Sequence, residues 1–547
     1  MFDEKRRFII KNYQKQKEFS SFLPGIAGIK GIPVWSFYVN RGQGICSFGI
    51  SDKQNPIMEF YPAHTSYELV RKKGFRTFVK ADGRYFEPFS SYEDESYMYV
   101  GNNELEISVK NEETGIRTEV LYYVLPEEKN GALVRQLTIT NQSGSSMDLE
   151  VVDGIPELIP YGVTLNDMKN VTQTIQAWMQ VENVEENLPF YRLRASSGDT
   201  TAVKQIEEGN FYAAFDENGN RLPVIVDPGV LFAYDTALEN AVNFQKHALS
   251  ELISGNQTVL NQIPCGFSCL SRKIAPGGAL KINTLIGHTM DYEGLKLFAE
   301  KGLDHTFFDS KYARTEKIAD EITAHINTVT ADKCFDEYCR QTYLDNLLRG
   351  GYPVQITKDK ILYIYSRKHG DLERDYNSFS MSAEYCSQGN GNYRDVNQNR
   401  RSDLIFSPFV GDYNIKIFYN LIQLDGYNPL VLLPETFITE DTSFLQGIVS
   451  EKREKELALI LEEKFFPGRL LMALHEGEEE LFGKILSHSQ KVQNADFSEG
   501  YWTDHWTYNL DLVEEYLEIY PEKREYLLYD DTDYLYYSSC ASVLPRE

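Results

Sequence analysis

Cysteine and tryptophan are scarce in this sequence, with 7 and 4 copies among 547 residues. A small, odd number of cysteines does not suit a disulfide framework, so we expect reduced thiols. Cys265 and Cys269 lie four residues apart without a second Cys or His pair nearby, which argues against a zinc site. The N-terminal region has only one short apolar run, Phe8 to Ile10, too brief for a signal-peptide core or a membrane span. We expect a cytoplasmic protein with no metal and no cofactor.

Basic residues are too few to balance the acidic ones, because 55 lysines and arginines face 81 aspartates and glutamates, a formal net charge of −26. Such a surface repels nucleic acid and anionic lipid, so we expect no nucleic-acid or membrane partner and favour a neutral ligand. A glycine-rich phosphate loop is also missing, since Gly389-Asn-Gly391 is too short and no helix with Lys-Ser/Thr follows it. Tyrosine and phenylalanine are abundant, with 36 and 31 copies. Most such rings pack in cores, and a minority can stack on apolar ligand faces.

Apolar and polar residues alternate with a period of two from about residue 30 to residue 290. The segments with this pattern, separated by turns such as Asn111-Glu-Glu-Thr-Gly115, are Leu105 to Lys110, Ile116 to Leu125, Ala132 to Thr140, Met147 to Val152 and, last, Leu280 to His288. They predict a meander of antiparallel strands that forms a large β-sandwich domain over residues 1–290.

The period then changes to 3.6, which predicts helices. Ile318, Ile322 and Ile326 form a stripe on a helix over Tyr312 to Ile326, and Asp291 to Lys301 predicts a shorter one, so residues 291–330 are expected to be a helical linker. The region 331–547 predicts about five more helices joined by long polar loops: Cys334 to Leu348, Tyr413 to Leu424, Glu451 to Phe466, Leu470 to His488 interrupted by Gly477, and Leu510 to Tyr520. Glycine or proline ends most of them.

The densest polar stretch of the chain runs from Tyr365 to Asn377 and from Ser387 to Arg401. Recognition of a sugar requires hydrogen bonds to hydroxyls that both donate and accept. Asn and Gln amides do both, carboxylates accept from two hydroxyls, and Arg donates in a planar fork. The segment is rich in these residues and stands between two predicted helices. It is either a sugar-binding loop or a solvated loop rich in turn formers and salt bridges.

A second cluster reads Gly500-Tyr-Trp-Thr-Asp-His-Trp-Thr-Tyr-Asn509 and opens the last predicted helix. It contains half of the tryptophans, Trp502 and Trp506, beside Asp504 and His505. The rings form either an aromatic platform at a glycan site or the packing surface of a helix N-terminus. His369 and His505 have no partner at metal-ligand spacing, so neither is expected to bind a metal.

These segments carry a family resemblance. Gly-Asn-Tyr393-Arg394-Asp395-x-x-Gln398 resembles the Gly-aromatic-Arg-Asp-x-x-Gln motif of the cellobiose phosphorylase group. Residues 367–377, 388–401 and 501–509 are still more similar to the β-1,3-oligoglucan phosphorylases. The expected order of domains is similar too, and it implies that residues 331–547 form the first part of an (α/α)6 barrel, so that the chain is the N-terminal half of such an enzyme.

The resemblance implies inverting phosphorolysis of β-glucan oligosaccharides, with inorganic phosphate as co-substrate and α-glucose 1-phosphate as product. One carboxylic acid protonates the glycosidic oxygen while phosphate attacks the anomeric carbon from the opposite face. The residues implied in substrate binding are Arg367, Arg374, Asp375, Tyr393, Arg394, Asp395, Gln398, Trp502, Asp504, His505 and Trp506. Asp395 would hold sugar hydroxyls, Arg394 would orient Asp395, and Arg367 is matched to a second sugar-binding arginine across a loop of different length.

The catalytic acid of that family lies in a Trp-Asn-Asp motif, and this sequence has none. We therefore expect the acid and the phosphate ligands beyond Glu547, with Asp504 as the candidate within the chain. The expected partners are a β-glucan, phosphate and the C-terminal half of the barrel, in cis or as a separate chain; a homodimer is also possible. An inverting glycoside hydrolase, which needs two carboxylates around a water, and a non-catalytic glucan-binding protein remain alternatives.

Overall fold

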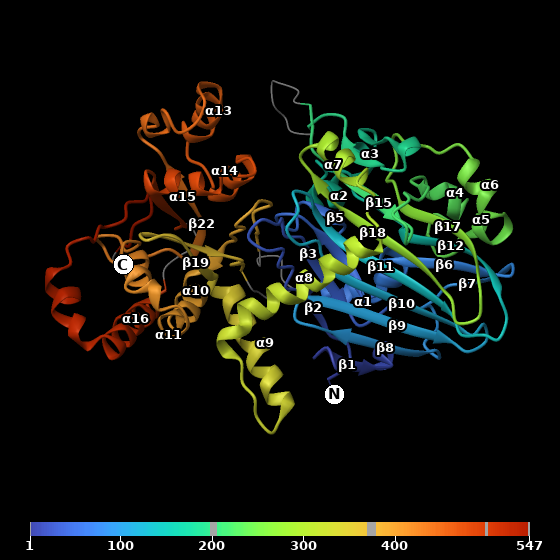
Figure 1. The fold of residues 1–547 in the computed structure, drawn as a ribbon, viewed down its shortest axis with the longest axis horizontal. Helices are drawn as coiled ribbons and strands as arrows, with labels where there is room; N and C mark the ends of the chain where they lie inside the picture. The colour runs from blue at the N-terminus through green and yellow to red at the C-terminus, as the bar shows by residue number, and fades with distance from the viewer. Residues whose placement is uncertain (1, 197–204, 369–378, 498–501, 545–547) are drawn as a thin grey trace. The chain divides into compact units, whose positions relative to one another are not determined.

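The computed structural model describes residues 2–196, 205–368, 379–497 and 502–544. The chain divides into two compact units, with the main division between Asp320 and Glu321 (Figure 1). Among the described residues, no helix is long and apolar enough to cross a membrane.

The first unit is built on three antiparallel sheets (Figure 1). The nine-stranded sheet has the order β1 (Phe8–Lys11), β8 (Glu95–Val100), β9 (Glu104–Asn111), β10 (Ile116–Val124), β11 (Gly131–Asn141), β18 (Ala279–Thr289), β15 (Gly209–Phe215), β14 (Phe190–Leu193) and β13 (Met179–Glu182). The five-stranded sheet has the order β16 (Val224–Ile225), β17 (Gly266–Ile274), β12 (Met147–Ile155), β6 (Arg76–Ala81) and β7 (Arg84–Phe86). A four-stranded sheet runs β2 (Ser20–Leu23), β3 (Trp35–Val39), β4 (Ile45–Gly49) and β5 (Pro56–Met58).

A buried ion pair joins the nine-stranded and five-stranded sheets. Arg135 on β11 and Asp153 on β12 have no exposed side-chain surface, and Arg135 Nη2 lies 2.6 Å from Asp153 Oδ1. Arg135 also donates to Thr77 on β6 at 3.0 Å and to Gln43 at 2.6 Å. Because these groups come from both sheets, the inner faces of the two sheets pack against one another, as the predicted β-sandwich requires.

The predicted strands appear at their expected positions as β9, β10, β11, β12 and β18. The prediction of one continuous meander is wrong at Met147–Ile155, because β12 pairs with β17 and β6 in the five-stranded sheet and not with β11. The place beside β11 is taken by β18, which returns from far along the chain. Alternation tells which face of a strand is buried and not which sheet the strand joins, so both arrangements fit the same pattern.

Helices pack against the sheets of the first unit. They are α1 (Ala63–Lys73), α2 (Leu165–Asn170), α3 (Thr172–Gln176), α4 (Pro228–Phe232), α5 (Val242–Lys246), α6 (Leu249–Ser254), α7 (Tyr292–Ala299) and α8 (His305–Thr323). The two helices predicted within residues 291–330 are present as α7 and α8. Leu295, Phe298 and Phe308 pack against Tyr123 and Leu285 of the nine-stranded sheet, so both helices cover one of its faces (Figure 1).

The second unit mixes helices with short strands. The helices are α9 (Lys333–Gly350), α10 (Tyr393–Arg400), α11 (Asp403–Phe406), α12 (Tyr413–Tyr419), α13 (Glu451–Leu461), α14 (Pro467–Ala473), α15 (Glu479–Ser487) and α16 (His505–Ile519). A hairpin joins β19 (Tyr352–Thr357) to β20 (Lys360–Ile364), and a three-stranded sheet has the order β21 (Gly391–Asn392), β22 (Val431–Ile438) and β23 (Gln490–Asp496). The expectation of polar loops between the helices is wrong where these strands lie, and the first part of an (α/α)6 barrel over residues 331–547 stays a prediction.

Candidate functional site

The first residues of α10 and α16 meet in the second unit. Tyr393 opens α10 and is fully buried, and His505 opens α16 with 3% of its surface exposed. Their rings stack with centroids 4.5 Å apart and planes 19° from parallel. The part of the polar stretch that forms α10 and the part of the tryptophan cluster that opens α16 therefore lie side by side.

A chain of hydrogen bonds holds the two helix ends together. The Tyr393 hydroxyl donates to Asn509 Oδ1 at 2.9 Å, and Asn397 Nδ2 donates to the same oxygen at 2.7 Å. His505 Nδ1 lies 2.6 Å from Asn428 Oδ1, an acceptor, so this nitrogen carries the proton. Burial lowers the pKa of His505 to about 4, helped by Arg394 and opposed by Asp504. The imidazole is thus neutral near neutral pH.

Three predicted sugar-binding residues lie on the outer side of α10. Arg394 and Gln398 are exposed and one helical turn apart, and the Asp395 side chain is 21% exposed. Asp395 Oδ2 accepts a hydrogen bond from Asn392 Nδ2 at 3.0 Å, and its Oδ1 is 3.6 Å from Arg394 Nε. A carboxylate in the first turn of a helix is favoured by the helix dipole. Asp395 retains lone pairs that can accept from a ligand.

The tryptophans stand on the outer side of the start of α16. Trp502 and Trp506 are four residues apart and are 55% and 41% exposed. Asp504 lies between them and precedes α16, and its Oδ2 accepts from the Tyr508 hydroxyl at 3.3 Å. We call the set Arg394, Asp395, Gln398, Trp502, Asp504 and Trp506, with Tyr393 and His505 beneath it, the α10–α16 site. Arg394 and Asp504 both act on the pKa of His505, so charged groups from the starts of both helices lie near its imidazole.

The other predicted arginine, Arg367, follows β20 and is buried. Its backbone N–H donates to Leu348 at the end of α9, and its Nη1 lies 3.7 Å from the sulfur of Met381. Burial lowers the pKa of Arg367 to about 10. Arg374 and Asp375 lie outside the described residues, so their predicted roles stay predictions.

Three buried carboxyl groups of the second unit were missed by sequence reasoning. Burial raises the pKa values of Glu384, Asp403 and Glu435 to about 7 in each case. Glu435 stands in the apolar segment Val-Leu-Leu-Pro-Glu-Thr-Phe. A single carboxylate among apolar residues was the one sequence feature that could have indicated a buried carboxyl group. Carboxyl groups of this kind can hold a proton near neutral pH, although burial limits their access to a substrate.

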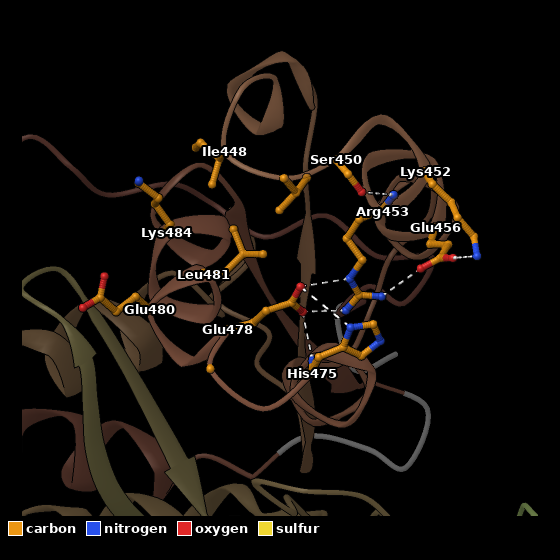
Figure 2. Close-up of a pocket in the computed structure, with 12 residues that line it drawn as sticks. Ile448, Ser450, Lys452, Arg453, Glu456, His475, Glu478, Glu480, Leu481 and Lys484 are labelled. Atoms are coloured by element: carbon orange, nitrogen blue, oxygen red, sulfur yellow. Dashed lines mark hydrogen bonds and ion pairs between the residues drawn. The ribbon is translucent and has the colours of Figure 1, made fainter.

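A separate pocket of about 560 Å³ lies between α13 and the start of α15 (Figure 2). Arg453 sits in it and binds Glu478 at 2.7 Å, Glu456 at 3.1 Å and the Ala473 carbonyl at 2.6 Å. The guanidinium is fully engaged, and none of the predicted sugar-binding residues lines the pocket. Its charges balance one another, which indicates a structural role for Arg453.

No protein-family model matches this sequence, and no curated protein matches it. Among solved structures, a bacterial glucoamylase complexed with acarbose matches 75% of this chain and 51% of its own chain, at 10% identity and a TM-score of 0.35. A human-microbiome protein named as a kojibiose phosphorylase matches 76% of this chain and 45% of its own, at 8% identity and a TM-score of 0.32. A polysaccharide lyase matches 48% and 33%, at 11% identity and a TM-score of 0.24.

This chain thus spans about half or less of the length of those structures. Such low TM-scores establish no shared fold, and we therefore base the function on the residues of the α10–α16 site.

Proposed function

We propose that the α10–α16 site binds a β-glucan oligosaccharide, with a preference for β-1,3 linkages, and that the chain acts as part of a β-glucan phosphorylase. The observation that carries this proposal is the stack of Tyr393 on His505, which joins two motifs that resemble those of the oligoglucan phosphorylases. Exposed Trp502 and Trp506 offer faces for sugar rings, while Arg394 and Asp395 offer a donor and an acceptor for hydroxyls. The net charge of −26 favours a neutral ligand.

In phosphorolysis phosphate replaces the water and the base of an inverting hydrolase, so one carboxylic acid suffices. Asp504 is the candidate acid within the α10–α16 site. Its carboxylate accepts from the Tyr508 hydroxyl, however, and stands between Trp502 and Trp506, whose exposed faces suit a sugar ring. We therefore assign Asp504 to substrate binding and expect the acid elsewhere in the enzyme.

Incubation of the chain with β-1,3-linked gluco-oligosaccharides, with and without inorganic phosphate, tests the proposal. Release of glucose 1-phosphate only when phosphate is present supports a phosphorylase. Release of glucose without phosphate indicates a hydrolase instead. Binding measured by calorimetry without turnover supports the binding site alone, and the absence of both binding and turnover refutes the assignment of the α10–α16 site.

A further inference from the structure

Helix α10 has a polar buried face. Arg394 and Gln398 point outward from it, whereas Tyr393, Asn397 and Arg400 are buried, with Val396 as their apolar neighbour. Packed helices usually bury an apolar stripe, which tolerates small rotations and shifts. Hydrogen bonds are directional, so a polar face fixes a helix in one rotation and one register.

Arg400 links this face to the neighbouring elements. Its Nε donates to the Gly350 carbonyl at the end of α9 at 2.6 Å, and its guanidinium lies 3.5 Å from the centre of the Tyr363 ring on β20. The Tyr363 hydroxyl in turn donates to Asp403 on α11 at 2.7 Å and accepts from Asn414 on α12 at 2.8 Å. One side chain of α10 therefore connects the helix to four other elements.

Glu435 on β22 completes the surroundings of Arg400. Its Oε1 accepts from Tyr413 and from Lys491 on β23, at 3.1 Å in both cases, and its backbone N–H donates to Gln388 at 3.1 Å. The charges of Glu435 and Asp403 act on Arg400 and partly offset the lowering of its pKa by burial. We call Arg400, Tyr363, Asp403 and Glu435 the α10 anchor.

The α10 anchor buries charged groups, which costs free energy of folding. Arg400 and Glu435 are 7% and 3% exposed, and Arg400 Nη1 and Glu435 Oε2 have no hydrogen-bond partner among the described residues. Replacement of a whole set of buried, paired charges by apolar residues of similar size is often neutral or stabilising, whereas removal of one partner alone is costly. Stability alone would therefore favour an apolar anchor, whereas control of the position of α10 favours the polar one.

We propose that Arg400 is a positioning residue, which fixes the rotation and register of α10 and thereby holds Arg394 and Asp395 in place for the oligosaccharide. Arg400 lies five residues after Asp395, roughly 7.5 Å along the helix, and acts through the helix without touching the ligand. The inference rests on the proposed function of the α10–α16 site.

Three variants of the chain test it: Arg400→Met, Arg400→Lys and the control Arg401→Met. Arg401 is the next residue of the chain and its side chain is 44% exposed, bound to Asp511 and Glu515 at the surface. Hydrogen exchange of a peptide over residues 393–406 reports the order of α10, and calorimetry with a β-1,3-linked glucose pentasaccharide reports the site.

We expect Arg400→Met to speed exchange in this peptide and to weaken binding, each at least tenfold, and to lower the melting temperature, because it leaves the buried carboxyl groups of Glu435 and Asp403 without their cation. Arg400→Lys should change exchange and binding less than Arg400→Met does, because lysine keeps the charge but loses the ring stacking and the Nε donor. Arg401→Met should change neither by more than twofold.

Wild-type exchange and affinity in Arg400→Met would overturn the inference. If Arg400→Met does not fold, wild-type values for Arg400→Lys overturn it in the same way. If the wild-type chain binds no oligosaccharide, the proposed function fails, and exchange alone then decides: faster exchange in Arg400→Met but not in Arg401→Met retains the role of Arg400 in placing α10.

Discussion

Replacement of Asp395 by asparagine removes the negative charge that α10 contributes to the outer side of the α10–α16 site. The side-chain volume stays nearly unchanged. Asp395 is 21% exposed, and Asn392 Nδ2 satisfies only part of its accepting capacity. The amide of an asparagine presents one donor end where the carboxylate presents an acceptor, so one sugar hydroxyl meets a mismatched partner. The fold should survive, because the carboxylate lies at the start of α10 and not in its core.

The magnitude follows from the kind of bond that is lost. A hydrogen bond to a charged group contributes about 1.5–3 kcal/mol, and a mismatched donor adds to the loss. We expect Asp395→Asn to cost about 2–3 kcal/mol of binding free energy, which raises the Kd for a β-1,3-gluco-oligosaccharide roughly 30- to 150-fold. In an enzyme that contains both this site and its acid, Asp395→Asn should lower kcat/KM. The corresponding loss of transition-state stabilisation should be about 3 kcal/mol or more.

Isothermal calorimetry on the wild type and the variant measures this change, and the matched control is Asp511→Asn. Asp511 is also a partly exposed aspartate, 3.0 Å from Arg401, but it belongs to the part of α16 beyond the site. The control should bind as the wild type does. An Asp395→Asn variant that binds within twofold of the wild type would remove Asp395 from the ligand and refute this reasoning.

Three further predictions concern other parts of the chain. Trp502→Ala and Trp506→Ala should weaken oligosaccharide binding more than phosphate binding, because an exposed ring can stack on a sugar face; loss of melting temperature without loss of affinity would instead assign both rings to packing. The pKa of His505 is lowered from 6.5 to about 4, so the unfolded chain binds this proton first as the pH falls. The contribution of His505 to the free energy of unfolding is complete above pH 6.5 and falls by up to about 3 kcal/mol as the pH approaches 4. His505→Gln should abolish this fall, and urea unfolding of the wild type and the variant at several pH values measures it. Asp153→Asn should destabilise the first unit by about 3–5 kcal/mol, because it leaves the charge of Arg135 buried without a counter-ion; a loss below about 1 kcal/mol in urea unfolding would contradict this.

Local structure could be predicted from the sequence where one period dominates. The strands β9, β10 and β18 and the helices α9, α13 and α16 lie within a few residues of their predicted ranges, because alternation and the 3.6 period report burial directly. The interruption predicted at Gly477 within Leu470 to His488 is confirmed, because α14 and α15 lie on either side of this glycine, where the chain turns with a φ of 89°. The strands β19 and β23 were missed because segments such as Gln490–Asp496 are polar and have no clean alternation.

The candidate site could be predicted as residue types and not as an arrangement. The motifs around Asp395 and Trp502 were found from their density of sugar-binding residues, but the bond from Tyr393 to Asn509 spans 116 positions, and no local pattern encodes it. The α10 anchor was missed for a similar reason. Arg400 stands in the polar stretch and Glu435 in a separate apolar segment, and the two come together in one buried network only when β22 and α10 pack together.

The pairing of β11 with β18 has a consequence for synthesis of the protein. These central strands of the nine-stranded sheet pair Leu133 with Ile286, while the chain between them builds most of the five-stranded sheet. At a translation rate of ~5–20 residues per second, the roughly 140 residues that separate the two strands take about 7–30 s to appear. Throughout that interval the edge of β11 is an open template for strands of other chains. Slower translation lengthens this exposure, so aggregation on the ribosome should begin at β11, and a chaperone that covers this strand until Thr289 has emerged should raise the yield of folded protein.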